Sequence, residues 1–226
     1  MSSSARPAFY ALRPGGWRDY VTLLHPPYTL WHLSYVAIGA ALAPHMNWPI
    51  LGWTTLAFLL AMGVGAHALD ELNGRPLQTR IPSALLVALA AVSIVAACAI
   101  GIAVAARHTW WLLAFVAVGA FVVVAYNLEL WEGRFHSDVW FALTWGAFPL
   151  LTGYFAVAER LRWEAAAGAA FAFATSLAQR TLSTPVRFAR RTQGDPTTTA
   201  ALERALELLA AAMPLLAGAL LVARAA

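Results

Sequence analysis

The residues best suited to chemistry in this sequence lie where a long apolar stretch ends. His67 is followed three and four residues later by Asp70 and Glu71, so in a helix the three side chains share one face. Carboxylate oxygens are the ligands that Mg²⁺ prefers, and the guanidinium of Arg75 suits the phosphates that Mg²⁺ accompanies. A histidine beside carboxylates would instead suit a transition metal. The same residues also fit the end of a helix with Gly74 as its cap, which is compatible with either metal site.

A second polar group follows a later apolar stretch and contains Tyr126, Asn127, Glu129 and Glu132. The two glutamates are three residues apart and can share a helical face. Taken alone, this group is explained by an anchor at the membrane surface that forms its own ion pairs. If the fold brings it next to His67, its carboxylates become further candidate metal ligands.

A third group contains Gln179, Arg180 and Arg187, again at the end of an apolar stretch. Arginine forks match phosphate oxygens bidentately, so a phosphate or a lipid head group is the natural partner. The alternative is a basic loop that fixes topology and lies on anionic lipid. Arg180 follows the apolar residues so closely that topology alone does not explain it. His32, near the start of an earlier apolar stretch, joins this group if it faces the same cavity.

The elements that must position these groups are predicted from composition. The 226 residues are 61% hydrophobic and only 12% charged, about half the charged fraction of a soluble domain. Seven stretches approach the roughly 20 apolar residues that cross a bilayer, and they lack the alternation of a barrel strand. They cover residues 28–43, 50–69, 83–106, 109–130, 139–158, 163–179 and 202–223. We predict one all-α domain, residues 1–226, that forms a polytopic membrane helix bundle of about seven transmembrane helices.

The charges predict how this bundle is oriented and what it contacts. All basic residues are arginine, which excludes Schiff-base chemistry on a lysine, and the formal net charge is +4. Residues 1–24 read as a cytoplasmic N-terminal arm and residues 180–201 as a basic cytoplasmic loop, since only Arg107, Arg160, Arg162 and Arg224 fall on the opposite side. We expect membrane lipids and no nucleic acid as partners, in the plasma membrane of a bacterial or archaeal cell.

With these residues in view, the layout resembles the UbiA superfamily of intramembrane prenyltransferases. Asp70 is similar to the later aspartate of the acidic motif at the end of the family's helix 2, and residues 73–76 continue much as the family loop does. Tyr126 is similar in position to a tyrosine-based motif after helix 4, and residues 146–154 resemble helix 5. The resemblance extends over residues 24–191.

The chain departs from the family pattern at two places. His67 stands at the first acidic position of the motif after helix 2. Gln179, Arg180 and Arg187 stand in the segment where the family has its second acidic motif. The resemblance implies a membrane protein that binds an isoprenoid or lipid phosphate, with Mg²⁺ as cofactor and prenyl transfer to an acceptor as the reaction.

The leading hypothesis assigns a role to each candidate residue. Asp70 and Glu71 would be catalytic and would hold Mg²⁺ together with His67, Glu129 and Glu132. The phosphate or its chain would contact Arg75, Tyr126, Asn127, Gln179, Arg180, Arg187 and His32. A second hypothesis is a lipid-binding or carrier protein that keeps the fold without the reaction. A third is a transition-metal enzyme with His67, Asp70, Glu132 and His136 as mixed ligands.

Overall fold

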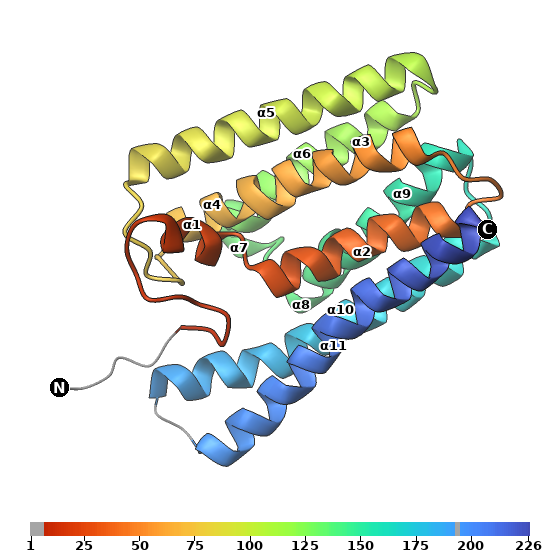
Figure 1. Cartoon of the computed structure of the whole chain (residues 1–226). Coiled ribbons are helices and arrows are strands. Elements are labelled where there is room, and N and C mark those ends of the chain that lie inside the picture. Colours follow the sequence, from red (N-terminus) through yellow and green to blue (C-terminus); the bar gives the residue numbers. More distant parts are fainter. Residues whose placement is uncertain (1–6, 193–194) are drawn as a thin grey trace.

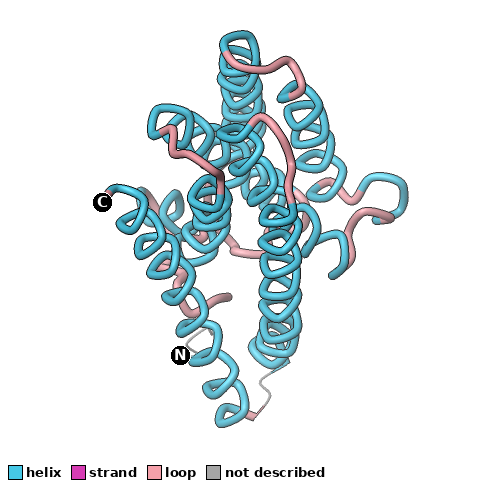
Figure 2. The backbone as a smooth tube through the Cα atoms, turned by 90° about the vertical axis from the view of Figure 1, so that its right-hand side faces the viewer, coloured by secondary structure: helices cyan, strands magenta, loops and turns pink. Residues whose placement is uncertain are grey.

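The computed structural model describes residues 7–192 and 195–226, and these ranges contain helices and loops but no strand (Figure 1, Figure 2). Arg6 and residues 193–194, which the sequence analysis assigned to the arm and to the basic loop, lie outside the described residues. The helices are α1 Trp17–Leu23, α2 Pro26–Leu42, α3 Trp48–Phe58, η1 Leu59–Ala66, α4 His67–Leu72, α5 Ser83–Arg107, α6 Leu112–Asn127, α7 Leu130–Gly133, α8 Asp138–Phe141, η2 Ala142–Ala147, α9 Phe148–Ala158, α10 Trp163–Thr192 and α11 Pro196–Ala225, where η1 and η2 are π-helical.

Four continuous helical segments are long and apolar enough to cross a membrane. They are Trp48–Leu72, Ser83–Arg107, Asp138–Ala158 and Pro196–Ala225. A helix of 25 residues, such as the first two, is about 37 Å long, which exceeds the roughly 30 Å of bilayer hydrocarbon. Each of the seven expected apolar stretches overlaps a helix. The chain is therefore an all-helical integral membrane protein, and the number of seven spans stays a prediction.

The centre of the bundle is the contact between α2 and α9, which pack closely along their length. A Cβ atom at Gly39 would lie 2.1 Å from the carbonyl oxygen of Leu150, and one at Gly153 would lie 2.2 Å from that of Val36. No side chain fits at either distance. Glycine at both positions therefore allows the two backbones to touch, as small residues do in membrane bundles.

Helices α10 and α11 form a long hairpin that extends past the other helices at the end where the N-terminal segment lies (Figure 1). The hydroxyl of Tyr35 fastens α10 to α2, because it lies 2.7 Å from the hydroxyl of Thr175 and accepts a bond of 3.1 Å from that of Ser176. The Trp31 indole N–H donates to the same hydroxyl at 2.5 Å. This buried group of hydrogen bonds fixes how α10 sits against the core.

The expected loop at residues 180–201 is mostly helical, so that prediction is wrong in its secondary structure. α10 continues through Pro185 to Thr192, and α11 begins at Pro196. Arginines end an apolar span because they cannot remain in hydrocarbon, but arginine is a good helix former and the helix continues beyond the span. Asp195 caps the start of α11 by accepting the amides of Thr197 at 3.1 Å and Thr198 at 2.9 Å.

The N-terminal arm is docked on the bundle rather than extended from it. It contains α1, and the buried carboxylate of Asp19 accepts the amide of Gly15 at 2.8 Å and that of Arg80 at 2.9 Å. The second bond joins the arm to the loop after α4. Residues before α1 are thereby held near the ends of α2, α4 and α10.

Candidate functional site

A cavity of about 850 Å³ lies where the N-terminal segment meets the start of α2, the ends of α4 and α6, and the second half of α10. Ten of the residues that the sequence singled out line it: His32, His67, Asp70, Tyr126, Asn127, Glu129, His136, Gln179, Arg180 and Arg187. Three others, Glu71, Arg75 and Glu132, do not line it. The three polar groups of the sequence thus meet at one site.

The guanidinium groups of α10 differ in their partners. Arg180 donates to Asp138 at 2.9 Å, and Arg190 pairs with Glu203 at 2.5 Å. The hydrogen bond from Arg187 to the hydroxyl of Thr184 is 3.4 Å long. Among the described residues, Arg187 has no carboxylate within ion-pair distance. It is the cavity's cation that is left to bind an anion.

The surroundings of Arg187 add to this role. Its guanidinium opens onto the cavity but has protein on most sides. Burial, followed by the positive charge of Arg180, lowers the pKa of Arg187 from its ordinary value. An arginine stays protonated at neutral pH despite such a shift. A poorly solvated positive charge therefore gains more from an anion here than on an open surface.

Asp70 and Glu71 face different surroundings. Asp70 lines the cavity, and the described residues offer it no hydrogen bond or ion pair. Glu71 is fully buried and its two oxygens accept the amides of Leu77 at 2.9 Å and Thr79 at 2.8 Å. The expectation that both carboxylates face one site does not hold, because the carboxylate of Glu71 is hydrogen-bonded to the loop after α4.

Arg75 also serves this loop rather than the cavity. Its backbone is left-handed, with φ 54°, and its guanidinium donates to the carbonyl of Ile81 at 2.6 Å and to the hydroxyl of Ser83 at 2.8 Å. Glu71 and Arg75 thus hold the loop between α4 and α5 from both sides. Sequence spacing could not reveal this, since all the partners except the Ser83 hydroxyl are backbone groups.

The glutamates after α6 do not share a helical face. Glu129, Trp131 and Glu132 all have positive φ, so the chain turns sharply there instead of continuing as a helix. Glu129 reaches the cavity edge, where its carboxylate lies 3.8 Å from Nδ1 of His136. Glu132 lies outside the cavity lining.

Three buried polar atoms around the cavity have no hydrogen-bond partner among the described residues. They are Nε2 of His25, the hydroxyl of Tyr126 and Oε1 of Gln179. Buried polar atoms are satisfied in most proteins, and an exception near a cavity is typical of a binding site. A polar ligand would give these atoms partners.

The N-terminal segment contributes residues that the sequence analysis missed. Tyr10 packs edge-on against Tyr28, with ring centroids 5.5 Å apart, and its ring is tilted against that of His25 at 5.3 Å. Burial and the nearby Tyr28 raise the pKa of Tyr10 well above its usual range, so its hydroxyl stays protonated. The signal that could have found it is the aromatic pair Phe9-Tyr10 within a polar, arginine-rich segment.

Three cavity histidines are held through Nδ1 by backbone carbonyls. His32 binds the carbonyl of Trp145 at 2.7 Å, His67 that of Gly63 at 3.1 Å, and His136 that of Tyr126 at 3.1 Å. These carbonyls come from irregular parts of helices. Gly63 and Trp145 lie in the π-helical segments η1 and η2, and Tyr126 is in the last turn of α6, where carbonyls lack helical partners.

The donor set does not fit the Mg²⁺ site that the resemblance implies. Within residues 7–192 and 195–226 no three histidine, cysteine, aspartate or glutamate side chains lie close enough together to hold a metal ion. Both oxygens of Glu71 accept backbone amides, and Glu132 does not line the cavity that Asp70 lines. Of the mixed set, His67, Asp70 and His136 line the cavity and Glu132 does not, and the described residues do not gather them into such a group.

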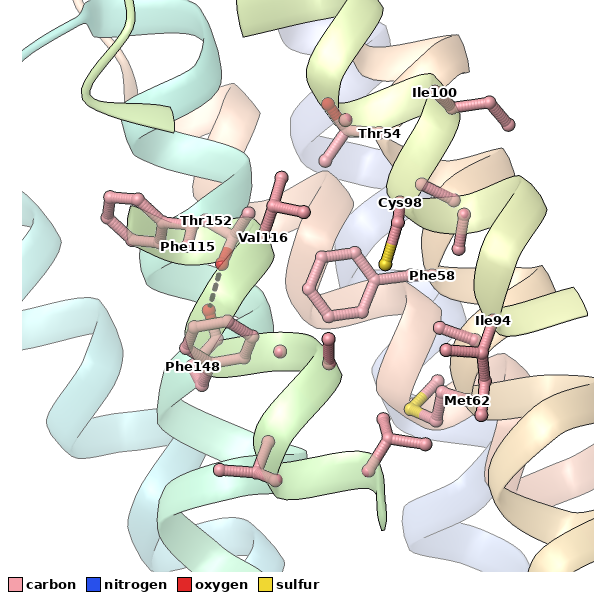
Figure 3. A pocket seen from close by; sticks show the side chains of 18 of the residues that line it. Thr54, Phe58, Met62, Ile94, Cys98, Ile100, Phe115, Val116, Phe148 and Thr152 are labelled. Carbon is pink, nitrogen blue, oxygen red and sulfur yellow. Dashed lines mark hydrogen bonds between the residues drawn. The ribbon is translucent and has the colours of Figure 1, made fainter. Parts of the chain in front are cut away.

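An apolar pocket adjoins the polar cavity, and Met62 and Trp145 line both. The pocket has a volume of about 100 Å³ and lies between η1, α5, α6 and α9. Figure 3 shows Phe58, Met62 and Cys98 around it, with Phe148 from α9 opposite. The hydroxyl of Thr152 donates within α9 to the Phe148 carbonyl at 2.8 Å, so the lining stays apolar.

Comparison with known proteins leaves the site to be interpreted from this chain alone. No family model, curated protein or solved structure matches it. The resemblance to the UbiA superfamily therefore stays a prediction. The geometry provides a polar cavity next to an apolar pocket, and in that cavity Arg187 has no carboxylate partner among the described residues.

Proposed function

We propose that this chain is an integral membrane protein that binds a lipid phosphate, and that an isoprenoid phosphate or diphosphate is its natural form. The phosphate occupies the polar cavity and the hydrocarbon chain enters the apolar pocket. The observation that carries the proposal is Arg187, a partly desolvated cation without a carboxylate partner, in a cavity that shares Met62 and Trp145 with an apolar pocket.

Such a ligand has an anionic phosphate at one end and an apolar chain at the other, and the site offers a matching environment for each. Guanidinium forks bind phosphate oxygens through short, charge-assisted hydrogen bonds. Arg187 and, beside it, Arg180 supply these groups. A hydrocarbon chain gains about 0.8 kcal/mol for each CH₂ that leaves water, and the pocket between α5, α6 and α9 is lined almost entirely by apolar groups. The isoprenoid form rests on the resemblance to the UbiA superfamily.

The binding step needs no metal in this proposal. Asp70 and Glu129 are the acids in the cavity that are not paired with arginine, and they do not form a metal-holding group. Arginines neutralise the phosphate charge instead. A chelator should therefore leave the affinity unchanged.

A prenyl transfer reaction is the second candidate, and Asp70 is the observation that favours it. This carboxylate shares the cavity with Arg187 and has no partner among the described residues. A carboxylate without a structural task next to a phosphate-binding cation suits a catalytic role. Turnover of an isoprenoid diphosphate that the Asp70→Asn variant loses, while it still binds the phosphate, would support this candidate.

The binding proposal is tested by the affinity of the purified protein for geranylgeranyl phosphate in lipid nanodiscs. Arg187→Gln should raise Kd roughly 10- to 100-fold, as expected for the loss of hydrogen bonds between charged groups. Arg134→Gln is the matched control, since Arg134 follows α7 at the same end of the bundle but does not line the cavity. Equal affinity of the wild type and Arg187→Gln would overturn the proposal.

A further inference from the structure

The cavity has a hydrogen-bond pattern that a phosphate alone does not satisfy. Nδ1 of His32, His67 and His136 each contacts a backbone carbonyl oxygen. A carbonyl oxygen can only accept, so Nδ1 must carry the proton in each ring. In a neutral imidazole the other nitrogen, Nε2, is then an acceptor. The backbone therefore fixes three histidines in the same tautomer.

The three Nε2 atoms are available to a ligand. All three rings line the cavity, and none of these atoms has a hydrogen bond to another described residue. None of them belongs to the fully enclosed polar atoms that lack a partner, so they contact open space. Asp70, whose ionised carboxylate accepts hydrogen bonds and donates none, lies beside them on α4.

Acceptors and donors come from different parts of the cavity. The histidines and Asp70 come from α2, α4 and the segment after α7, whereas Arg180 and Arg187 come from α10. An ionised phosphate accepts hydrogen bonds, so it satisfies donors such as the arginines and the Tyr126 hydroxyl but none of the acceptors. The acceptors need a ligand group that donates.

We propose that the phosphate of the bound lipid, isoprenoid or other, is esterified to a hydroxylated head group, whose O–H groups donate to Nε2 of His67, His136 and His32 while the phosphate binds Arg187. This inference rests on the proposed function and adds the chemistry of the head group to it. An ammonium group could also donate, but the unpaired charge of Arg187 repels a cation in the same cavity. Hydroxyl groups are neutral and avoid this cost.

The inference is tested with two lipids that differ only in hydroxyl groups. Dioleoyl phosphatidylglycerol and dioleoyl phosphatidylpropanol have the same chains, the same three-carbon head group and the same single negative charge, and the second lacks hydroxyls. Wild-type protein in phosphatidylcholine nanodiscs, measured by native mass spectrometry, should bind phosphatidylglycerol roughly 3- to 30-fold more tightly, as expected for one or two net hydrogen bonds.

Matched variants of His67 separate acceptor loss from structural damage. Asparagine can keep a short N–H donor toward the Gly63 carbonyl but has no group at the position of Nε2, whereas glutamine can place a carbonyl oxygen near that position. His67→Asn should lower the preference for phosphatidylglycerol several-fold, and His67→Gln should retain more of it. His45→Asn, outside the cavity, should retain all of it.

The outcomes distinguish this inference from the proposed function. Equal binding of the two lipids by the wild type, with Arg187→Gln still weakening both, would overturn the hydroxyl inference and leave phosphate binding intact. A preference for phosphatidylethanolamine over phosphatidylglycerol would also overturn it. No binding of either lipid or of geranylgeranyl phosphate, with no effect of Arg187→Gln, would overturn the proposed function itself.

Discussion

Asp70 and Glu71 are adjacent in the sequence, and their carboxylates have opposite surroundings. Glu71 is enclosed and accepts two backbone amides from the loop after α4, whereas Asp70 faces the cavity. One carboxylate thus builds the loop that shapes the site, and the other is left for a ligand. The difference can be measured, because a structural and a functional carboxylate respond differently to the loss of charge.

We predict that Glu71→Gln destabilises the fold and that Asp70→Asn does not. In Glu71→Gln the amide NH₂ would face a backbone N–H in a buried place, which costs about 2 kcal/mol in the free energy of unfolding. Asp70→Asn should change stability by less than about 0.5 kcal/mol and act on ligand affinity instead. Unfolding in mixed micelles measures the first effect, and a Glu71→Gln protein as stable as the wild type would contradict it.

The sequence predicted correctly that His67 and Asp70 of α4 face one site, but it did not predict that Glu71 binds the loop after α4. The spacing of His67 and Asp70 is a local helical property, and both line the cavity. The task of Glu71 depends on where the amides of Leu77 and Thr79 turn back, and the conformation of that loop is set by tertiary contacts. No spacing rule contains that information.

The helices are held in place by their caps and by their contacts with one another, and one cap and one contact can be tested. The first is the cap of α11. Asp195 accepts the amides of Thr197 and Thr198, and its hydrogen bonds with Thr198, then Thr197, lower the pKa of the carboxyl from its ordinary value of 3.8. A lowered pKa means that the ionised form is the one that stabilises the helix start.

We therefore predict that protection of the first turn of α11 against hydrogen exchange is complete at neutral pH and is lost as the pH falls through the lowered pKa of Asp195. Asp195→Asn should weaken the cap at every pH, and Asp195→Ala should remove it. Hydrogen exchange of residues 199–203, followed by mass spectrometry between pH 3 and pH 7 with correction for the intrinsic rate, checks this. An unchanged exchange rate in Asp195→Ala would contradict it.

The second test concerns the contact between α2 and α9. A Cβ at Gly153 would meet the Val36 carbonyl oxygen at 2.2 Å, so Gly153→Ala must push the two backbones apart. We predict a loss of about 1–3 kcal/mol, the usual cost of overpacking. Gly52→Ala in α3 is the control, because its Cβ meets no atom within 4 Å, and alanine there should stabilise the helix by up to about 1 kcal/mol. Thermal unfolding in one detergent compares the two.

The elements were predicted well wherever a continuous apolar run decides the outcome. α5 coincides with the expected stretch almost residue for residue, because a span of this kind is a local property of composition. α10 was predicted too short, since the end of an apolar run marks the end of a span and not the end of a helix. The helix α1 within the expected arm was missed because it is short.

In the whole molecule, the polar cavity and the apolar pocket form adjoining parts of one site. Met62 from η1 and Trp145 from η2 line both. A ligand with a charged head and a hydrocarbon chain can therefore place each end in matching surroundings. That these segments meet could not be predicted from local sequence, since more than 80 residues separate Met62 from Trp145 in the chain.

We predict that filling the apolar pocket makes affinity depend on chain length. Ala120→Phe should occupy much of the pocket and weaken geranylgeranyl phosphate at least 10-fold, because several CH₂ groups lose their burial. Dimethylallyl phosphate, with five carbons, should bind the variant and the wild type alike. Ala117→Phe, on the exposed side of the same helix, should change neither affinity. Equal loss for both phosphates would contradict the two-part site.

The π-helical segment η1 carries an extra residue without turning α4 away from the site. A π-helix holds one residue more than the α-helix it replaces, and its wider turn takes up that residue. Deleting one residue between Leu59 and Ala66 would therefore restore a regular helix and leave His67 and Asp70 on the cavity side. What such a deletion would disturb is the irregular turn from which the Gly63 carbonyl holds Nδ1 of His67 at 3.1 Å. The extra residue thus bears on how the His67 ring is oriented and not on whether α4 reaches the cavity.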